Sequence, residues 1–322
     1  MKKTSKILLL ILVNILFLAI VLFVIEKSIY NREVKIHNKN NINHTNPNAF
    51  TYKTHFPSYM TEEKEYFTGE SNLWHGRKPD GTEYEGEPTI LLFGCSYGQG
   101  QYLDFNQTFS YKLAHTLKRP VFNRSIHGGN LVQMYLQTQQ EKFYKEVPPT
   151  DEVIFIMIHD HYRRMFLEYH CMLDIHVLPQ YKLKNGELIY YDYNNKIKNF
   201  YRALYSRKLI NHIQTEKYIY DEKNAEEITT LASTYLIKTK ETLEKKWNRK
   251  INFTVIFYEP ADILYKEKLV EKLEANDFNT FSTKDLTNED LMSEKYFMKE
   301  NYHPNENAWN LLTPLIIEKM GL

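Results

Sequence analysis

The stretch "ILLFGCSYGQG", residues 90–100, begins as an apolar run and ends in a Cys-Ser pair set among glycines. A short apolar run bounded by turn residues is typical of a buried strand. Small residues after such a strand form either an ordinary tight turn or a sharp strand-to-helix turn that exposes a serine. Residues 94–98 spell the G-x-S-x-G pattern of the second kind of turn. Ser96 is therefore a candidate nucleophile.

The segments that follow alternate between strand-like and helix-like patterns. Apolar runs predict strands at 120–125, 151–158 and 251–260, and helical spacing of apolar residues predicts helices at 108–117, 130–146, 225–247 and after residue 304. A long helix is also expected after the strand at 251–260. Such alternation predicts an α/β fold with a parallel sheet covered by helices on both sides.

A Tyr-rich insertion, at about 172–222, interrupts this alternation. It contains "YKLKNGELIYYDY", in which Asn185-Gly186 lies between two alternating stretches and predicts a β-hairpin. The insertion is either a lid that offers aromatic faces to a substrate or a packed structural excursion. Exposed aromatic patches are uncommon on soluble domains, so the packed excursion is favoured.

The N-terminal region carries a predicted membrane anchor. Residues 7–25 are apolar apart from Asn14, and a helix of this length spans the hydrocarbon core of a bilayer. The run is longer than the apolar region of a signal peptide and no small-x-small cleavage site follows it, which favours an uncleaved anchor. The three lysines of residues 1–6 favour a short cytoplasmic tail, although basic residues also follow the span. The large domain is then expected on the periplasmic or extracellular side.

Composition limits the remaining organisation. Residues 26–50 include "HNKNNINHTNPN", residues 37–48, which is rich in Asn and almost without apolar side chains; this predicts a flexible tether at 26–50 before a catalytic domain at 51–322. A formal net charge of +1 argues against a dedicated nucleic-acid-binding protein. The two cysteines, Cys95 and Cys171, are too few for a disulfide scaffold or a paired-cysteine zinc motif.

A candidate base for Ser96 lies near the C-terminus, in "KENYHPNENAWNLLTPLI", residues 299–316. A serine needs such a base to act as a nucleophile. Pro304 disfavours helical geometry at His303, which places the imidazole on a loop before the last helix. Glu300 could accept the other ring N–H and orient the imidazole. Alternatively, His303 is a surface residue or a helix cap.

Three short blocks together resemble the SGNH (GDSL-like) hydrolase family, in its membrane-anchored cell-envelope type. They are "FGCSYGQG", "FNRSIHGGN" and "YHPN", within residues 89–322. The resemblance implies a flavodoxin-like three-layer sandwich and ester hydrolysis or acyl transfer without a metal or other cofactor. It also implies that Ser96 is the nucleophile, that His303 is the base, and that the amides of Ser96 and Gly128 belong to the oxyanion hole.

The sequence departs from the family pattern at three places. Cys95 and Glu300 stand where the family commonly has aspartates. The third block, usually Gly-x-Asn-Asp, is replaced by "IMIHDHYRR", residues 156–164. His161 is predicted to replace the missing asparagine in the oxyanion hole, because a ring N–H can donate like an amide and its position ends the strand. His159 and Asp160 are the alternatives for this role. Asp160 and Arg164 are also weaker candidates for substrate binding; the arginine could hold an anionic substrate, with a solvated basic turn as the favoured alternative.

Two other chemistries compete with this assignment. His159 and His161 would lie on the same side of an extended strand and could bind zinc or iron with a carboxylate. No third ligand at metal spacing is recognisable, so a metal site is not favoured. The G-x-S-x-G pattern also occurs in α/β-hydrolases, but there several strands precede the serine, whereas Ser96 follows the first strand here.

The expected function is that of a membrane-anchored serine esterase acting on an acyl ester, such as an acetyl ester, of a cell-envelope glycan or lipid. An O-acyltransferase using the same residues and a catalytically silent glycan-binding or scaffold protein are the alternatives. The expected partners are the acylated substrate and the membrane, with no nucleic acid; a membrane-protein partner is left open.

Overall fold

The computed structural model of the chain describes residues 79–126, 129–166, 180–191, 221–259, 263–299 and 302–322. All of these residues belong to one of the chain's two units, the unit formed by residues 52–191 and 212–322. The predicted tail (1–6), anchor (7–25) and tether (26–50) lie outside the described residues. Among the helices within the described ranges, none combines the length and apolarity that a membrane span requires.

A five-stranded sheet forms the centre of the fold, and every neighbouring pair of its strands is parallel. The strands lie in the order β2 (Val121–Asn123), β1 (Ile90–Phe93), β3 (Glu152–Met157), β6 (Asn252–Phe257), β7 (Phe278–Ser282). Counted among the strands of this sheet, the order is 2-1-3-4-5, which is the flavodoxin-like order. The predicted α/β class with a parallel sheet is therefore confirmed.

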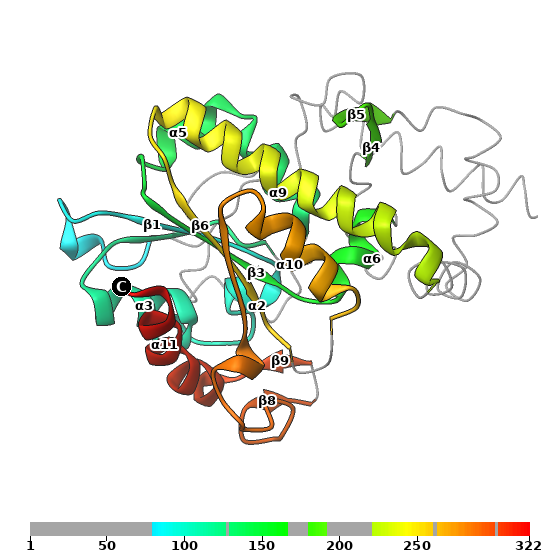
Figure 1. The fold of residues 1–322 in the computed structure, drawn as a ribbon. Helices are drawn as coiled ribbons and strands as arrows, with labels where there is room; N and C mark the ends of the chain where they lie inside the picture. The colour runs from blue at the N-terminus through cyan, green and yellow to red at the C-terminus, as the bar shows by residue number, and fades with distance from the viewer. Residues whose placement is uncertain (1–78, 127–128, 167–179, 192–220, 260–262, 300–301) are drawn as a thin grey trace, which may run out of the picture. The chain divides into compact units, whose positions relative to one another are not determined.

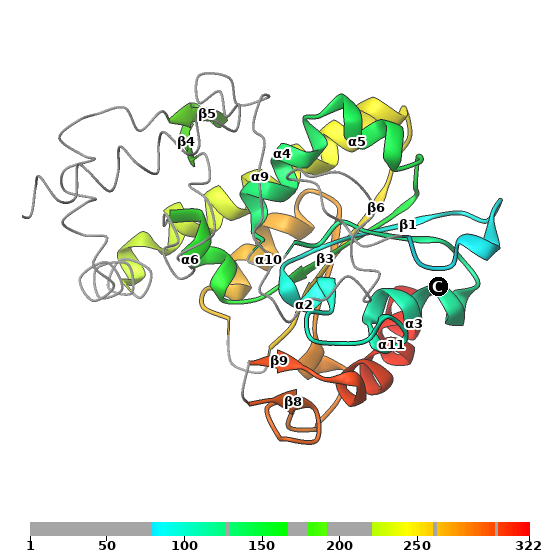
Figure 2. The same ribbon diagram turned by 180° about the vertical axis from the view of Figure 1, so that it is seen from behind.

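Helices cover both faces of the sheet (Figures 1 and 2). Ile90 and Leu92 point into one core cluster, while Leu91 and Phe93 point into the other. The first cluster is covered by α3 (Phe109–Leu117) and α11 (Glu306–Met320). The second is covered by α4 (Leu131–Thr138), α5 (Glu141–Glu146), α6 (Asp160–Phe166), α9 (Ala225–Trp247) and α10 (Lys266–Glu274). Burial on both faces explains why the central strands read as continuous apolar runs.

Several short elements complete the described part of the chain. They are α2 (Ser96–Gln99), the hairpin strands β4 (Gln180–Lys184) and β5 (Glu187–Tyr191), the pair β8 (Phe297–Met298) and β9 (His303–Pro304), and the 3-10 helices η2 (Thr82–Tyr84), η3 (Phe105–Gln107), η4 (Glu222–Asn224) and η5 (Thr283–Asp285). The sequence predicted the hairpin but neither β7 nor the β8–β9 pair.

The single helix predicted over 130–146 is two helices. Gln140 has extended backbone angles, with φ −99° and ψ 131°, and separates α4 from α5. The break turns Phe143 into the core, where its ring stacks on Phe93 with centroids 6.1 Å apart. The Tyr144 hydroxyl donates to the carbonyl of Thr138 at 2.6 Å, which satisfies a carbonyl at the end of α4.

The β4–β5 hairpin has the predicted turn. Asn185 (φ 55°) and Gly186 (φ 79°) both adopt left-handed backbone conformations, as a two-residue type I′ turn requires. Leu183 and Leu188 pack against the core cluster that α9 covers. This packing favours the structural excursion over the lid for the hairpin, while residues 172–179 and 192–220 of the insertion lie outside the described residues.

A buried asparagine ties β2 to the segment after β1. Asn123 is fully buried, and its Nδ2 donates to the carbonyl of Gly98 at 2.8 Å and to the Ser110 hydroxyl at 3.0 Å. Its Oδ1 accepts the backbone N–H of Ser125 at 3.0 Å. These bonds satisfy both ends of the amide and connect β2 with α2 and α3.

Replacement of Asn123 by alanine should lower the free energy of unfolding by about 2–3 kcal/mol, because it leaves buried donors and acceptors unsatisfied. Urea unfolding followed by tryptophan fluorescence measures the change. The control is Asn279→Ala, at an exposed position on β7, with an expected change below about 0.5 kcal/mol. Equal effects of the two substitutions would contradict the role given to Asn123.

Candidate active site

Ser96 lies at the sharp strand-to-helix turn that the sequence predicts. Strand β1 ends at Phe93, Cys95 has extended backbone angles, and α2 begins at Ser96. The helix ends after one turn at Gly100, whose φ is 73° and whose N–H bonds to the carbonyls of Ser96 and Tyr97. The Ser96 side chain is therefore placed at the carboxyl end of β1, where it is mostly buried.

The segment after β2 touches this turn through backbone contacts. A Cβ on Gly129 would lie 2.9 Å from the carbonyl oxygen of Gly94 and 2.6 Å from that of Ile126, so only glycine fits there. The Ile126 N–H also donates to the Gly94 carbonyl at 3.2 Å. The first two sequence blocks thus meet in space. Gly128, the predicted oxyanion-hole glycine, lies outside the described residues.

The segment that carries His303 also lies against α2. His303 belongs to β9, and the Tyr97 hydroxyl donates to the carbonyl of Tyr302 at 2.8 Å. The imidazole lies 5.2 Å from the Tyr97 ring and 5.0 Å from the Tyr102 ring, measured between centroids. The loop before the last helix and the turn after the first strand therefore meet, although they are about 200 residues apart in sequence. Glu300 lies outside the described residues.

The helix-capping alternative for His303 is wrong. The side chain of Asn305 caps α11, because its Oδ1 accepts the N–H of Ala308 at 3.2 Å. His303 precedes this cap and contacts α2 residues instead. The imidazole therefore lies against the rings of Tyr97 and Tyr102, in and after α2.

Three tyrosines that were not among the predicted site residues surround this junction. Burial, followed by the charges of Cys95 and Asp160, raises the pKa of Tyr97, so its hydroxyl remains a neutral donor. Tyr102 (φ 68°) and Tyr302 (φ 57°) both have left-handed backbones, which bulky residues rarely adopt. Strained backbone of this kind is concentrated at functional sites. No sequence pattern marks these tyrosines among the many others.

The end of β3 differs from the prediction. The strand ends at Met157 and α6 begins at Asp160, so His161 lies in the first turn of a helix rather than at the end of a strand. The reason is local: the His161 N–H donates to the Ile158 carbonyl at 3.0 Å and starts a turn. His159 and His161 therefore do not share a strand face, and the metal alternative loses its geometric basis. Within the described residues, no three His, Cys, Asp or Glu side chains gather as metal ligands.

His161 has a defined tautomer. The ring is fully buried, and its Nδ1 accepts the backbone N–H of Ile158 at 3.0 Å. Burial and then the charge of Arg164 hold the pKa of His161 well below its usual range, so the ring is neutral. A neutral ring that accepts at Nδ1 carries its proton on Nε2. The predicted oxyanion-hole role of His161 needs this donor and stays a prediction.

Asp160 and Arg164, the weaker candidates for substrate binding, pair with each other. Arg164 Nη2 lies 3.2 Å from Asp160 Oδ2, and Nη1 donates to the carbonyl of Gly129 at 2.9 Å. The guanidinium thus connects α6 to the segment that touches the Ser96 turn.

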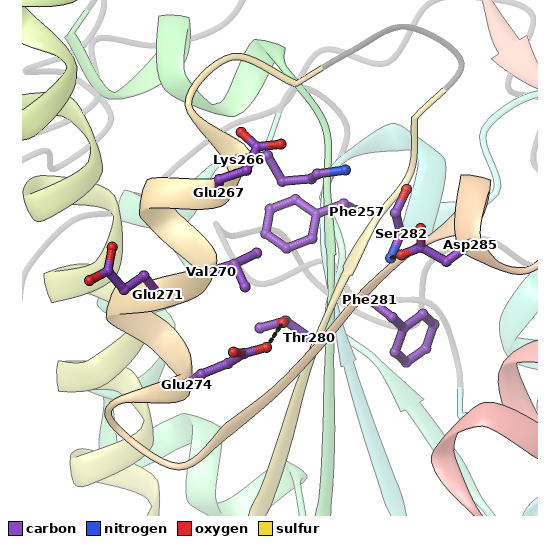
Figure 3. Close-up of a pocket in the computed structure, with 10 residues that line it drawn as sticks. All are labelled: Phe257, Lys266, Glu267, Val270, Glu271, Glu274, Thr280, Phe281, Ser282 and Asp285. Carbon is purple, nitrogen blue, oxygen red and sulfur yellow. Dashed lines mark hydrogen bonds between the residues drawn. The ribbon is translucent and has the colours of Figure 1, made fainter.

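A separate pocket lies between α10 and β7 (Figure 3). It has a volume of about 430 Å³ and an apolar wall of Phe257, Val270 and Phe281. The carboxylates on its lining come mainly from α10, where Glu274 accepts a hydrogen bond from Thr280 at 2.7 Å. None of the predicted site residues lines this pocket, so it is distinct from the candidate active site at Ser96.

Comparison with known proteins gives similarities of fold. No protein-family model matches the chain, and no curated protein matches its sequence. Among solved structures, a lipolytic protein of the G-D-S-L family from Veillonella parvula matches over 72% of this chain and 97% of its own, with 13% identity and a TM-score of 0.40.

Two further structures match at a similar level. A putative G-D-S-L lipolytic protein from Desulfitobacterium hafniense has 10% identity and a TM-score of 0.41, over 72% of this chain and 99% of its own. A salicylyl-acyltransferase from a tetracycline biosynthetic pathway has 10% identity and a TM-score of 0.40, over 74% of this chain and 55% of its own. These values do not assign the chain to a family, so its chemistry rests on its own residues.

The depressed pKa of His161 predicts a specific loss of stability in acid. Below the ordinary histidine pKa of about 6.5, the unfolded chain binds a proton at this position that the folded chain does not. The free energy of unfolding should therefore fall as the pH drops, by up to about 1.4 kcal/mol per pH unit for this residue. His161→Asn, which keeps an acceptor for the Ile158 N–H, should reduce this fall.

Urea unfolding of both proteins between pH 7.5 and 5 measures the difference. Asn279→Ala, at an exposed position on β7, is the control and should leave the pH dependence nearly unchanged, because it removes no titratable group. Parallel pH profiles for the wild type and His161→Asn would show that His161 is protonated in the folded protein.

Proposed function

We propose that this chain is a serine ester hydrolase in which Ser96 is the nucleophile and His303 is the base. The observation that carries the proposal is the packing of the His303 segment on the Ser96 turn through Tyr97. A nucleophile-and-base pair is recognised by such juxtaposition rather than by sequence order. A second support is the position of Ser96, which follows the carboxyl end of β1 next to β3, where flavodoxin-like sheets bind their ligands.

The reaction follows the usual course of acyl transfer through a serine. His303 takes the proton of the Ser96 hydroxyl while Ser96 Oγ attacks the acyl carbonyl. The tetrahedral intermediate collapses, His303 gives the proton to the leaving alcohol, and the acyl group remains on Ser96. Water, deprotonated by His303, then attacks this ester and releases the acid and the free serine. Glu300 is proposed to hold the imidazole in the required orientation.

The negative charge on the carbonyl oxygen needs hydrogen-bond donors. We assign this role to the backbone N–H groups of Ser96 and Gly128 and to Nε2 of His161. The support for His161 is its neutral form with the proton on Nε2. The support for Gly128 is the contact of the adjoining Gly129 with the Gly94 carbonyl, which brings this segment to the turn. Preorganised donors of this kind commonly account for a large share of catalysis.

The proposed substrate is an acyl ester, such as an acetyl ester, of a cell-envelope glycan or lipid. The apolar run at 7–25 and the polar stretch at 26–50 support a membrane anchor and tether, with the catalytic domain on the extracytoplasmic side. Tyr302, which is 69% exposed next to His303, offers an aromatic face to such a substrate.

The full chain should hydrolyse p-nitrophenyl acetate and react covalently with a fluorophosphonate probe. Ser96→Ala should abolish labelling and lower kcat/KM by at least about 10³-fold, because the nucleophile is lost. His303→Gln should cause a comparable loss through the base. The matched control is Ser125→Ala, which removes a buried hydroxyl close to α2 and should leave labelling and turnover within about twofold.

Labelling that persists in Ser96→Ala would overturn the proposal. Product analysis with an added sugar acceptor separates the outcomes of turnover: release of free acid means hydrolysis, whereas an acylated sugar means transfer by the same residues. Ligand binding without any turnover by the wild type would indicate a binding protein.

A further inference from the structure

The segment 129–130 comes close to the Ser96 turn, and something must hold it there. Within the segment, Gly129 N–H donates to the Ile126 carbonyl at 2.7 Å, and Asn130 forms a capping box with Gln133 at the start of α4. These bonds stabilise the segment internally. They do not fix its position relative to β3 and the turn after it.

Arg164 of α6 fixes the position of this segment. Its side chain is only 5% exposed, and Nη1 donates to the Gly129 carbonyl at 2.9 Å. In return, Asn130 Nδ2 donates to the backbone carbonyl of Arg164 at 2.9 Å. One residue of α6 therefore both donates to and accepts from two successive residues of the segment.

Asp160 holds the guanidinium in place for this contact. It lies one helical turn before Arg164, and Oδ2 accepts from Nη2 at 3.2 Å. A guanidinium is planar and presents its donors in a fixed fork, so bonds to Asp160 and Gly129 together define its plane. A lysine ammonium at this position would keep the charge without the fork.

We propose that Arg164 is a positioning residue that holds the 129–130 segment against the Ser96 turn and so sets the geometry of the oxyanion hole. This inference rests on the proposed function, and it replaces the substrate-binding role predicted for Arg164 from the sequence. Asp160 acts through Arg164 as its orienting partner. Residues 156–164, which replace the family's third block, would then have two roles. Arg164 would hold the oxyanion hole in place, and His161 would supply the predicted donor.

The charge of Arg164 acts on both sides of the candidate site. It lies close enough to lower the pKa of His161, after burial, and it opposes the upward shift in the pKa of Tyr97. His161 follows the end of β3, and Tyr97 belongs to the turn after β1. A fixed positive charge near both residues favours the negative oxygen of a tetrahedral intermediate.

A positioning role differs from a structural one in its kinetic signature. Oxyanion contacts strengthen in the transition state, so their misplacement lowers kcat while KM changes little. A residue that only stabilises the fold would lower the unfolding temperature without this split. The comparison of kcat, KM and thermal unfolding in the same variants therefore separates the two roles.

The experiment compares the full-length wild type with Arg164→Gln and Arg164→Lys, using p-nitrophenyl acetate. Arg164→Gln should lower kcat about 10- to 100-fold with KM within about threefold, because the oxyanion donors are misplaced. Arg164→Lys should recover part of this loss through its charge. Arg124→Gln is the matched control: Arg124 is 11% exposed and pairs with Glu146 at 2.9 Å, and its kcat should stay within about twofold of wild type.

An unchanged kcat in Arg164→Gln, or an equal loss in Arg124→Gln, would overturn the inference. If Arg164→Gln does not fold, Asp160→Asn decides: it weakens only the bond that orients the guanidinium, so a severalfold fall in kcat supports the inference and an unchanged kcat refutes it.

Absence of turnover in the wild type would contradict the proposed function instead. Hydrogen–deuterium exchange of peptides covering residues 126–134 then tests, without any need for turnover, whether Arg164 holds the 129–130 segment. Faster exchange in Arg164→Lys than in the wild type would support the positioning of this segment by Arg164, and unchanged exchange would refute it.

Discussion

Two backbone segments touch at the carboxyl end of β1, and the candidate site depends on this contact. Gly129 approaches the Gly94 carbonyl more closely than any side chain would allow, and Gly98 lies similarly close to the Ser125 hydroxyl. Asn123 of β2 joins the same two segments, because its Nδ2 donates to the carbonyl of Gly98 while its Oδ1 accepts the N–H of Ser125. The Ser96 turn is thus packed against the segment that follows β2.

The strand order explains why there is room for a site at this point. After β1 the chain passes to α3 on one face of the sheet, and after β3 it passes to α6 on the other. Neighbouring connections that leave on opposite faces open a crevice between their strands. Ser96 follows β1 and the α6 residues follow β3, so both lie at this switch point, and His303 of β9 contacts Tyr97 of α2 beside it.

Most of the central architecture could be predicted from the sequence, because β1, β3 and β6 are continuous apolar runs and α9 has clear helical spacing. The flanking residues predicted that the Ser96 turn and the His303 segment would meet, and they do so through Tyr97; the pairing of the two side chains stays a prediction. Strand β7 escaped prediction since exposed Asn279 interrupts its short edge pattern. The hydrogen bond from Arg164 to Gly129 could not be predicted. Its acceptor is a backbone carbonyl 35 residues away, and a backbone acceptor leaves no pattern of side chains in the sequence. Gly128 and Glu300 lie outside the described residues.

The bond between Tyr97 and Tyr302 joins residues 205 positions apart. During synthesis, the strand and turn that carry Ser96 leave the ribosome long before the residues that carry His303. At typical elongation rates of about 5–20 residues per second, this interval lasts on the order of ten seconds or more. A growing chain therefore carries the Ser96 turn without the His303 segment throughout that time, and the contact through Tyr97 forms only after the β8–β9 pair has docked.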